Sequence, residues 1–158
     1  MYRILQLLEQ DARLTPARIA QILDMSEDEV VRKIREYEDD NVVLGYKTVV
    51  DWEKTEKENV TALIEVRVSP QKGMGFDELA RRIKSYPQVQ SLYLMSGSYD
   101  FTVVISGRTL LEVSRFVSEN LSTMENVIST STAFVLKKYK DAGVDYDPRD
   151  EREDFRND

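Results

Sequence analysis

Apolar side chains recur at helical spacing in three short runs over the first 40 residues, and polar turns separate the runs. The first run covers residues 4–8 and the second covers residues 19–23. In the third, Val30, Ile34 and Tyr37 follow the i, i+4, i+7 spacing of one helix face. This pattern predicts three short amphipathic helices that bury their apolar faces against one another.

Polar residues mark the starts of the second and third helices. Thr15 before Pro16 is typical of an N-cap followed by proline at the first helical position. Ser26, with Glu29 three residues later, forms a capping-box pattern. The second helix is therefore expected to begin at Pro16 and the third just after Ser26.

Chain reversals flank the third helix at Asp24 and Asn41. Among residues other than glycine, Asp and Asn best tolerate the left-handed conformation that such reversals require. Residues 42–50, VVLGYKTVV, are rich in β-branched side chains on both sides of Gly45. They predict two short strands that form a wing-like hairpin behind the helices.

A different periodicity begins at residue 60, where apolar and polar residues alternate and predict a strand over residues 60–68. Two more helices and three more strands are then expected. The helices are expected at residues 76–83, before Pro87, and 110–121, and the strands at residues 89–95, 101–106 and 127–139. Two β-α-β halves in one chain predict an antiparallel sheet with both helices on one face.

These elements place the chain in the α+β class, with two domains. A winged helix-turn-helix is expected over residues 1–51, and a ferredoxin-like βαββαβ domain over residues 60–140. The polar residues 52–59 are expected to be a linker. Residues 141–158 hold 8 acids against 3 bases and show little periodicity, which is typical of a disordered or solvated tail.

Composition narrows the class of protein. The chain of 158 residues is 41% apolar and contains neither cysteine nor histidine. It therefore lacks thiolate chemistry and the commonest general base and transition-metal ligand, so we expect no enzyme, no metal site and no cofactor. No apolar run reaches the length of about 18 residues that a membrane span needs, and no signal peptide is evident, so a cytoplasmic protein is expected.

The net charge of −7 is unevenly distributed. Residues 1–52 hold 11 acids and 7 bases, whereas residues 53–140 hold 10 acids and 12 bases. The strongly basic footprint of many nucleic-acid-binding domains is missing. Any binding of DNA must rest on a local cluster of basic side chains.

Several motifs, in this order and spacing, resemble the Lrp/AsnC (leucine-responsive, feast/famine) family of prokaryotic transcriptional regulators. They are ILQLLEQDARLTPARIAQIL, the S-x-x-x-V-x-x-x-I pattern of the third helix, LGY, SGSYD and TSTAFVLKKYK. The resemblance covers about residues 2–140. Asp24 and Asn41 stand where the family usually has glycine, and both can take the same backbone conformation.

The resemblance implies double-stranded DNA as a partner, with the third helix in the major groove. The candidate DNA-contacting residues are Thr15, Arg18, Ser26, Asp28, Val31, Arg32, Lys33, Arg35 and Lys47. Basic side chains of this helix suit phosphate oxygens, and Arg32 also suits a guanine edge. The acids at positions 27–29 favour the helix start through the dipole and the capping box, but they weaken attraction to phosphate. A merely solvated helix face is the alternative.

The resemblance also implies that the SGSYD turn helps to bind an amino acid or related metabolite. The candidate effector-binding residues are Met95, Ser96, Gly97, Ser98, Tyr99, Asp100, Thr130 and Thr132. Backbone N–H groups around Gly97 could hold a carboxylate, and Asp100 could accept from an ammonium group. Alternatively, Gly97 only provides a positive φ in a hairpin and Asp100 only caps it.

The leading hypothesis is therefore a DNA-binding transcriptional regulator modulated by a small-molecule effector, most simply an amino acid. One face of a βαββαβ sheet is left bare, so a homodimer is expected, and the resemblance implies higher assembly such as an octamer. A metabolite-binding protein that no longer reads DNA is the alternative. A haem-biosynthesis decarboxylase family of similar architecture depends on histidine, which this chain lacks.

Overall fold

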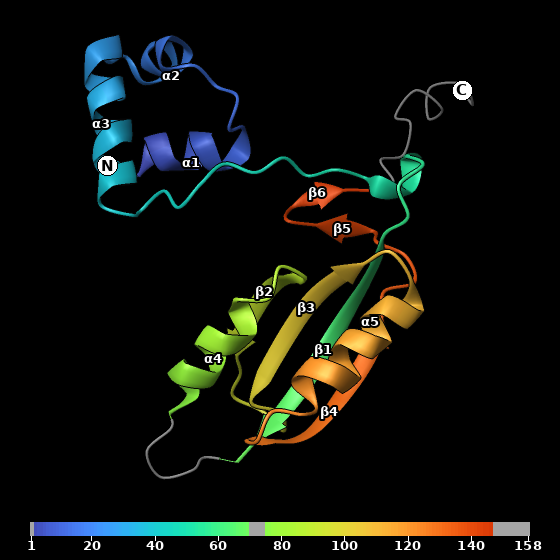
Figure 1. The fold of residues 1–158 in the computed structure, drawn as a ribbon. Coiled ribbons are helices and arrows are strands. Elements are labelled where there is room, and N and C mark those ends of the chain that lie inside the picture. The colour runs from blue at the N-terminus through green and yellow to red at the C-terminus, as the bar shows by residue number, and fades with distance from the viewer. Residues whose placement is uncertain (1, 70–74, 147–158) are drawn as a thin grey trace. The chain divides into compact units, whose positions relative to one another are not determined.

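The computed structural model describes residues 2–69 and 75–146 of the chain. The chain divides into two compact units, residues 1–49 and residues 50–158. Figure 1 shows a helical N-terminal unit and a unit built on a four-stranded sheet. Each unit has its own hydrophobic core, so each is described separately.

The N-terminal unit consists of the three predicted helices, α1 (Arg3–Gln10), α2 (Pro16–Leu23) and α3 (Glu27–Asp39). Its core contains residues from all three helices: Ile4, Leu8, Ile19, Ala20 and Val30. Ile34 and Tyr37 are partly buried against this core, as the i, i+4, i+7 spacing predicted. The helix-turn-helix prediction is therefore confirmed in both element order and buried faces.

The predicted helix boundaries are confirmed by their hydrogen bonds. The Thr15 hydroxyl oxygen accepts from the Arg18 N–H, and the Ser26 hydroxyl oxygen accepts from the Glu29 N–H, each at 3.3 Å. Asp24 has φ 54° and Asn41 has φ 55°, so both take the left-handed conformation. Although neither residue is glycine, both take the backbone conformation that the chain reversals around α3 require.

The wing-like hairpin predicted for residues 42–50 is wrong. Residues 44–51 have no regular secondary structure, and a short 3₁₀ helix, η1 (Trp52–Lys54), follows them. Leu44 is 88% exposed and the other residues of the range 44–49 are also exposed, so this segment lacks the buried face that would support a ladder. A sequence rich in β-branched residues needs such a surface to form a hairpin, because isolated two-stranded hairpins are only marginally stable in water.

The second unit has the predicted βαββαβ order. It contains β1 (Val60–Val68), α4 (Phe76–Lys84), β2 (Val89–Leu94), β3 (Phe101–Gly107), α5 (Leu110–Phe116), a π-helical turn η2 (Val117–Leu121) and β4 (Val127–Phe134). The strands are antiparallel in the order β2-β3-β1-β4. Figure 1 shows α4 and α5 on the same face of this sheet.

Alternation along the strands sends one set of side chains under the helices and the other to the open face of the sheet. Ile64 of β1 pairs with Val103 of β3, and both are fully buried in the core. Their neighbours Leu63 and Val104 pair on the open face, where Leu63 is 41% exposed. The two faces therefore differ as the period-two pattern predicted.

The end of the second unit differs from the prediction. The last long strand was expected to run to residue 139, but β4 ends at Phe134. Residues 141–146 do not follow the tail prediction, because β5 (Lys140–Asp141) and β6 (Val144–Asp145) pair as a small hairpin. Ala142 (φ 47°) and Gly143 (φ 77°) supply the two positive φ values of a tight hairpin loop. The rest of the predicted tail, residues 147–158, lies outside the described residues.

Within the described parts of the chain, no helix is long and apolar enough to cross a membrane. The same residues contain no cluster of three or more carboxylates that could hold a metal ion.

Candidate functional site

The outward face of α3 carries two exposed guanidinium groups. Arg32 and Arg35 line a shallow concave strip together with Asp28 and Val31. Lys33 lies beside them, but its Nζ is 2.7 Å from Glu36 Oε2. This hydrogen bond raises the pKa of Lys33 and partly offsets its charge. Arg32 and Arg35 are therefore the main basic groups on this face.

Acidic side chains lie on both sides of these arginines. Glu27, Asp28 and Glu29 occupy the first turn of α3, where the helix dipole favours them. The other end of the strip is lined by three more acids, Glu36, Asp39 and Asp40. The basic surface of α3 is thus a narrow band about one turn long.

The remaining DNA candidates lie outside this band, and two of them serve the helix starts. The Thr15 and Ser26 hydroxyl oxygens accept the capping hydrogen bonds of α2 and α3, and their own hydrogens can still be donated. Arg18 donates from Nη1 to Gln21 Oε1 at 3.1 Å. Lys47 is exposed in the irregular segment that follows α3.

The SGSYD turn joins β2 to β3 and is fastened to β1 by hydrogen bonds. The Asp100 N–H donates to the Val66 carbonyl at 3.0 Å, and the Val68 N–H donates to Asp100 Oδ2 at 2.8 Å. The Met95 N–H closes the turn by donating to the Asp100 carbonyl at 2.8 Å. Asp100 therefore joins the turn to the end of β1, a structural role that differs from the hairpin cap raised above as an alternative.

Arg67 is a functional candidate that the sequence pattern did not reveal. Its Nε donates to the Ser98 carbonyl at 3.1 Å, and its guanidinium lies 5.3 Å from the centre of the Tyr99 ring. The β1–β4 register shifts between Arg67 and Val68, so a bulge lies at the same place. The alternation of apolar and polar residues in β1 assigns Arg67 to the open face of the sheet. No local sequence pattern indicates its contact with Ser98, 31 residues later in the chain.

The other predicted effector residues divide into two groups. Met95 and the Ser96, Gly97 and Ser98 positions are exposed in the turn, but Gly97 is not among the described glycines with positive φ. The alternative in which Gly97 only provides a positive φ is therefore wrong. A side chain there would contact nothing within 4 Å, so in the single chain this position has room for a ligand.

Thr130 and Thr132 are not brought to the turn within one chain. They pair with Val66 and Ile64, which places them on the helix-covered side of β4. The Thr130 hydroxyl lies 3.3 Å from the Ser122 hydroxyl, and β1 separates β4 from the strand that follows the turn. A site that contains both the turn and these threonines would need a second copy of the chain.

A helix-turn-helix followed by a βαββαβ unit with an open sheet face and an exposed turn defines a class, the two-domain DNA-binding regulators. Residues 1–43 match the model of a winged helix-turn-helix DNA-binding domain, and residues 61–145 match that of the Lrp/AsnC ligand-binding domain. The chain belongs to the Lrp/AsnC family of transcriptional regulators.

Individual relatives agree with this assignment. The uncharacterized HTH-type transcriptional regulator YugG of Bacillus subtilis is 43% identical over 149 residues, which cover 94% of this chain and 90% of YugG. The leucine-responsive regulatory protein of Rhizobium meliloti is 28% identical and covers 89% of each chain. A transcriptional regulator of Neisseria meningitidis (NMB0573), solved in complex with L-methionine, superposes with a TM-score of 0.73 at 25% identity over 87% of this chain and 88% of its own.

Proposed function

We propose that this regulator binds duplex DNA through α3 and changes that binding when an amino acid occupies the SGSYD turn. The observation that carries the proposal is the presence of two independently packed units on one chain. One unit presents exposed arginines on its third helix, and the other presents an exposed turn with room for a ligand. Thermodynamic linkage between amino-acid binding and DNA binding then makes the DNA affinity depend on the amino acid.

The contact with DNA rests on Arg32 and Arg35. Their guanidinium groups suit phosphate oxygens, and Arg32, nearer the start of α3, also suits the O6 and N7 atoms of guanine. The acids on both sides limit the affinity of a single module. A dimer doubles the contact and offsets this weakness through effective concentration.

The effector site is centred on the turn, and its ligand is proposed to be a zwitterion. The relative solved with L-methionine supports the amino-acid class. Arg67 lies beside the turn and has further N–H groups that suit a carboxylate, besides the Nε bond to Ser98. Asp100 accepts one bond from Val68, and a carboxylate can accept more than one, so it can also bind the ammonium group.

Assembly is proposed to follow from the open face of the sheet. Leu63 and Val104 lie on the face of the sheet opposite α4 and α5. Packing this surface against a second copy removes apolar area from water, and closed two-fold assembly is the commonest outcome. We propose a homodimer as the minimum unit and an octamer as the higher assembly.

A salt titration of DNA binding tests the proposal. The logarithm of the binding constant for the promoter region of its own gene should fall linearly with the logarithm of salt concentration. The double variant Arg32→Ala/Arg35→Ala should flatten that slope by about 1.8 per protomer, or about 3.6 for a bound dimer, because each lost phosphate contact contributes about 0.9. Arg81→Ala/Arg82→Ala on α4 is the matched control, since it removes the same charge from the other unit.

The second candidate is a metabolite-binding protein whose α3 no longer reads DNA. The acids on both sides of Arg32 and Arg35 favour it. In that case an amino acid still raises the melting temperature, but no duplex binds with a salt-dependent affinity. The same titration, with and without the amino acid, separates the two candidates.

A further inference from the structure

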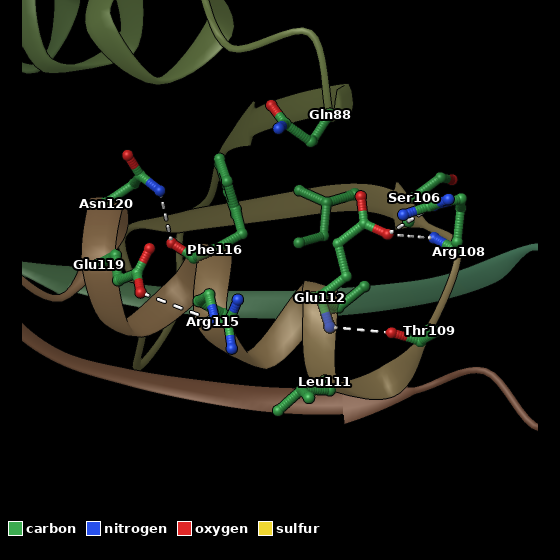
Figure 2. Close-up of a pocket in the computed structure, with 13 residues that line it drawn as sticks. Gln88, Ser106, Arg108, Thr109, Leu111, Glu112, Arg115, Phe116, Glu119 and Asn120 are labelled. Atoms are coloured by element: carbon green, nitrogen blue, oxygen red, sulfur yellow. Dashed lines mark hydrogen bonds and ion pairs between the residues drawn. The ribbon is translucent and has the colours of Figure 1, made fainter.

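The outer surface of α5 carries four charged side chains in an alternating row. They are Arg108, Glu112, Arg115 and Glu119, the only charged residues between positions 107 and 121. Their spacings of 4, 3 and 4 residues are those of one face of a helix. Figure 2 shows the four side chains in this order along α5 and the π-helical turn η2.

Within one chain, these charges form two exposed ion pairs. Arg108 Nε lies 3.4 Å from Glu112 Oε2, and Arg115 Nε lies 3.8 Å from Glu119 Oε1. The Arg108 side chain is 80% exposed, and those of Arg115 and Glu119 are 63% and 65% exposed. Exposed pairs of this kind contribute little to the stability of a chain. The row is therefore available for contacts with another molecule.

Two leucines beside the row are also exposed. Leu110 is 56% exposed and Leu111 is 67% exposed, although the opposite side of α5 is buried in the core. Leu111 also lines, with Glu112 and Arg115, a cavity of about 370 Å³ between α5 and the end of β3. The outer surface of α5 thus combines apolar side chains, charged side chains and a hollow, as the surfaces of protein–protein interfaces do.

The order of the charges selects a second copy of this chain as the partner. Read from either end of the row, the spacings are the same, but the signs of the charges are opposite. Two copies of α5 that lie antiparallel about a two-fold axis therefore place Arg108 of each copy opposite Glu119 of the other. The same axis places Glu112 of each copy opposite Arg115 of the other. A parallel arrangement would place like charges together, which opposes association.

We propose that the outer surface of α5 is a homotypic interface that joins homodimers into the higher assembly. This inference rests on the assembly described under the proposed function, in which the homodimer forms through the open face of the sheet. α5 lies on the other face of that sheet (Figure 1), so one chain can use both surfaces at once. Two different two-fold interfaces on one chain extend a dimer into a larger assembly.

Charge reversal at the two ends of the row tests the proposal, with the mass of the full chain measured by light scattering at one fixed concentration. The wild type should exceed the mass of two chains of 18.3 kDa. Arg108→Glu places two acids together at both ends of the antiparallel pair, and Glu119→Arg places two arginines together there. Each single variant should therefore fall to the mass of a dimer.

Two rescue experiments distinguish contacts between chains from contacts within a chain. An equimolar mixture of the two single variants should regain the wild-type mass, because unlike copies again place an acid opposite a base. The double variant Arg108→Glu/Glu119→Arg should also regain it, although it places like charges side by side within each chain. A role within the chain alone predicts a further loss in the double variant. Arg82→Glu, at an exposed position on α4, is the matched control and should leave the mass unchanged.

The substituted positions are exposed, so the melting temperature of each variant should stay close to that of the wild type. If a single variant unfolds, the mass of the double variant decides. The proposal is overturned if the wild type never exceeds a dimer, if a folded single variant keeps the wild-type mass, or if the double variant fails to regain it. If the single variants fall to one chain, the α5 interface is supported and the open-face homodimer is wrong. Failure of the proposed DNA binding would appear separately, in the salt titration, because none of these variants alters α3.

Discussion

Replacing Asp100 with alanine is predicted to destabilise the ligand-binding unit, quite apart from any effect on an effector. The change removes the carboxylate oxygen that accepts from the Val68 N–H at 2.8 Å in a partly buried position. Val68 is itself buried, with 6% of its side-chain surface exposed, so its N–H is left without an acceptor. The turn and the end of β1 lose the bond that joins the Asp100 side chain to the strand.

The size of the effect follows from the kind of bond. A hydrogen bond to a charged group contributes about 1.5–3 kcal/mol, and loss of one partner leaves the other desolvated. We therefore expect Asp100→Ala to lower the free energy of unfolding by about 2 kcal/mol. For a unit of this size, such a change lowers the melting temperature of the sheet unit's own transition by about 10 °C.

Asp100→Asn separates the structural role from the charge. The asparagine amide keeps an oxygen that can accept from Val68 but loses the charge, so the melting temperature of the sheet unit should lie between those of Asp100→Ala and the wild type. Differential scanning calorimetry at one fixed protein concentration measures both variants, because assembly makes the transition depend on concentration. An unchanged melting temperature in Asp100→Ala, or an equal loss in both variants, would refute the reasoning.

Three further changes have defined outcomes. Leu63→Asp places a charge on the open sheet face and should shift the mass measured by light scattering toward the monomer; an unchanged mass would place the interface elsewhere. Gly107→Ala brings a Cβ within 3.0 Å of Val113 Cγ2 and should cost about 1 kcal/mol in urea unfolding, unless Val113 can move freely. Burial and the bond to Glu38 raise the pKa of Tyr46, so the stability it contributes is full below pH 10 and falls as pH rises through the folded pKa. Tyr46→Phe should remove from an absorbance titration one phenol whose pKa is raised, and an unaltered titration curve would contradict this.

The fold could be predicted from the sequence wherever local periodicity and burial agree. β1 was predicted over residues 60–68, as observed, because strict alternation leaves one register that buries the apolar set. The starts of α2 and α3 were also predicted, because the bonds of Thr15 and Ser26 reach only three residues along the chain. Local chemistry decides such features.

The candidate site was less predictable because its contacts join residues that are distant in sequence. The Asp100 carboxylate accepts from the N–H of Val68, 32 residues earlier, and no local pattern in the sequence indicates this bond. Arg67 could be assigned to a face of the sheet but not to a turn. The prediction of a hairpin around Gly45 was wrong for a related reason. Residues with high strand propensity form a strand only when the tertiary structure supplies a surface for them to pack against.

The unequal size of the two cores has a thermal consequence. Among the residues that the structure describes, the helix-turn-helix core contains 5 buried residues, whereas the core of the sheet unit contains 14. A small core offsets less chain entropy, so the helical unit should melt first and by a transition of its own. The protein then has no single melting point, and there is a temperature range in which the ligand-binding unit stays folded while the DNA-reading unit has unfolded. Warming could thus release this regulator from DNA without any ligand at all.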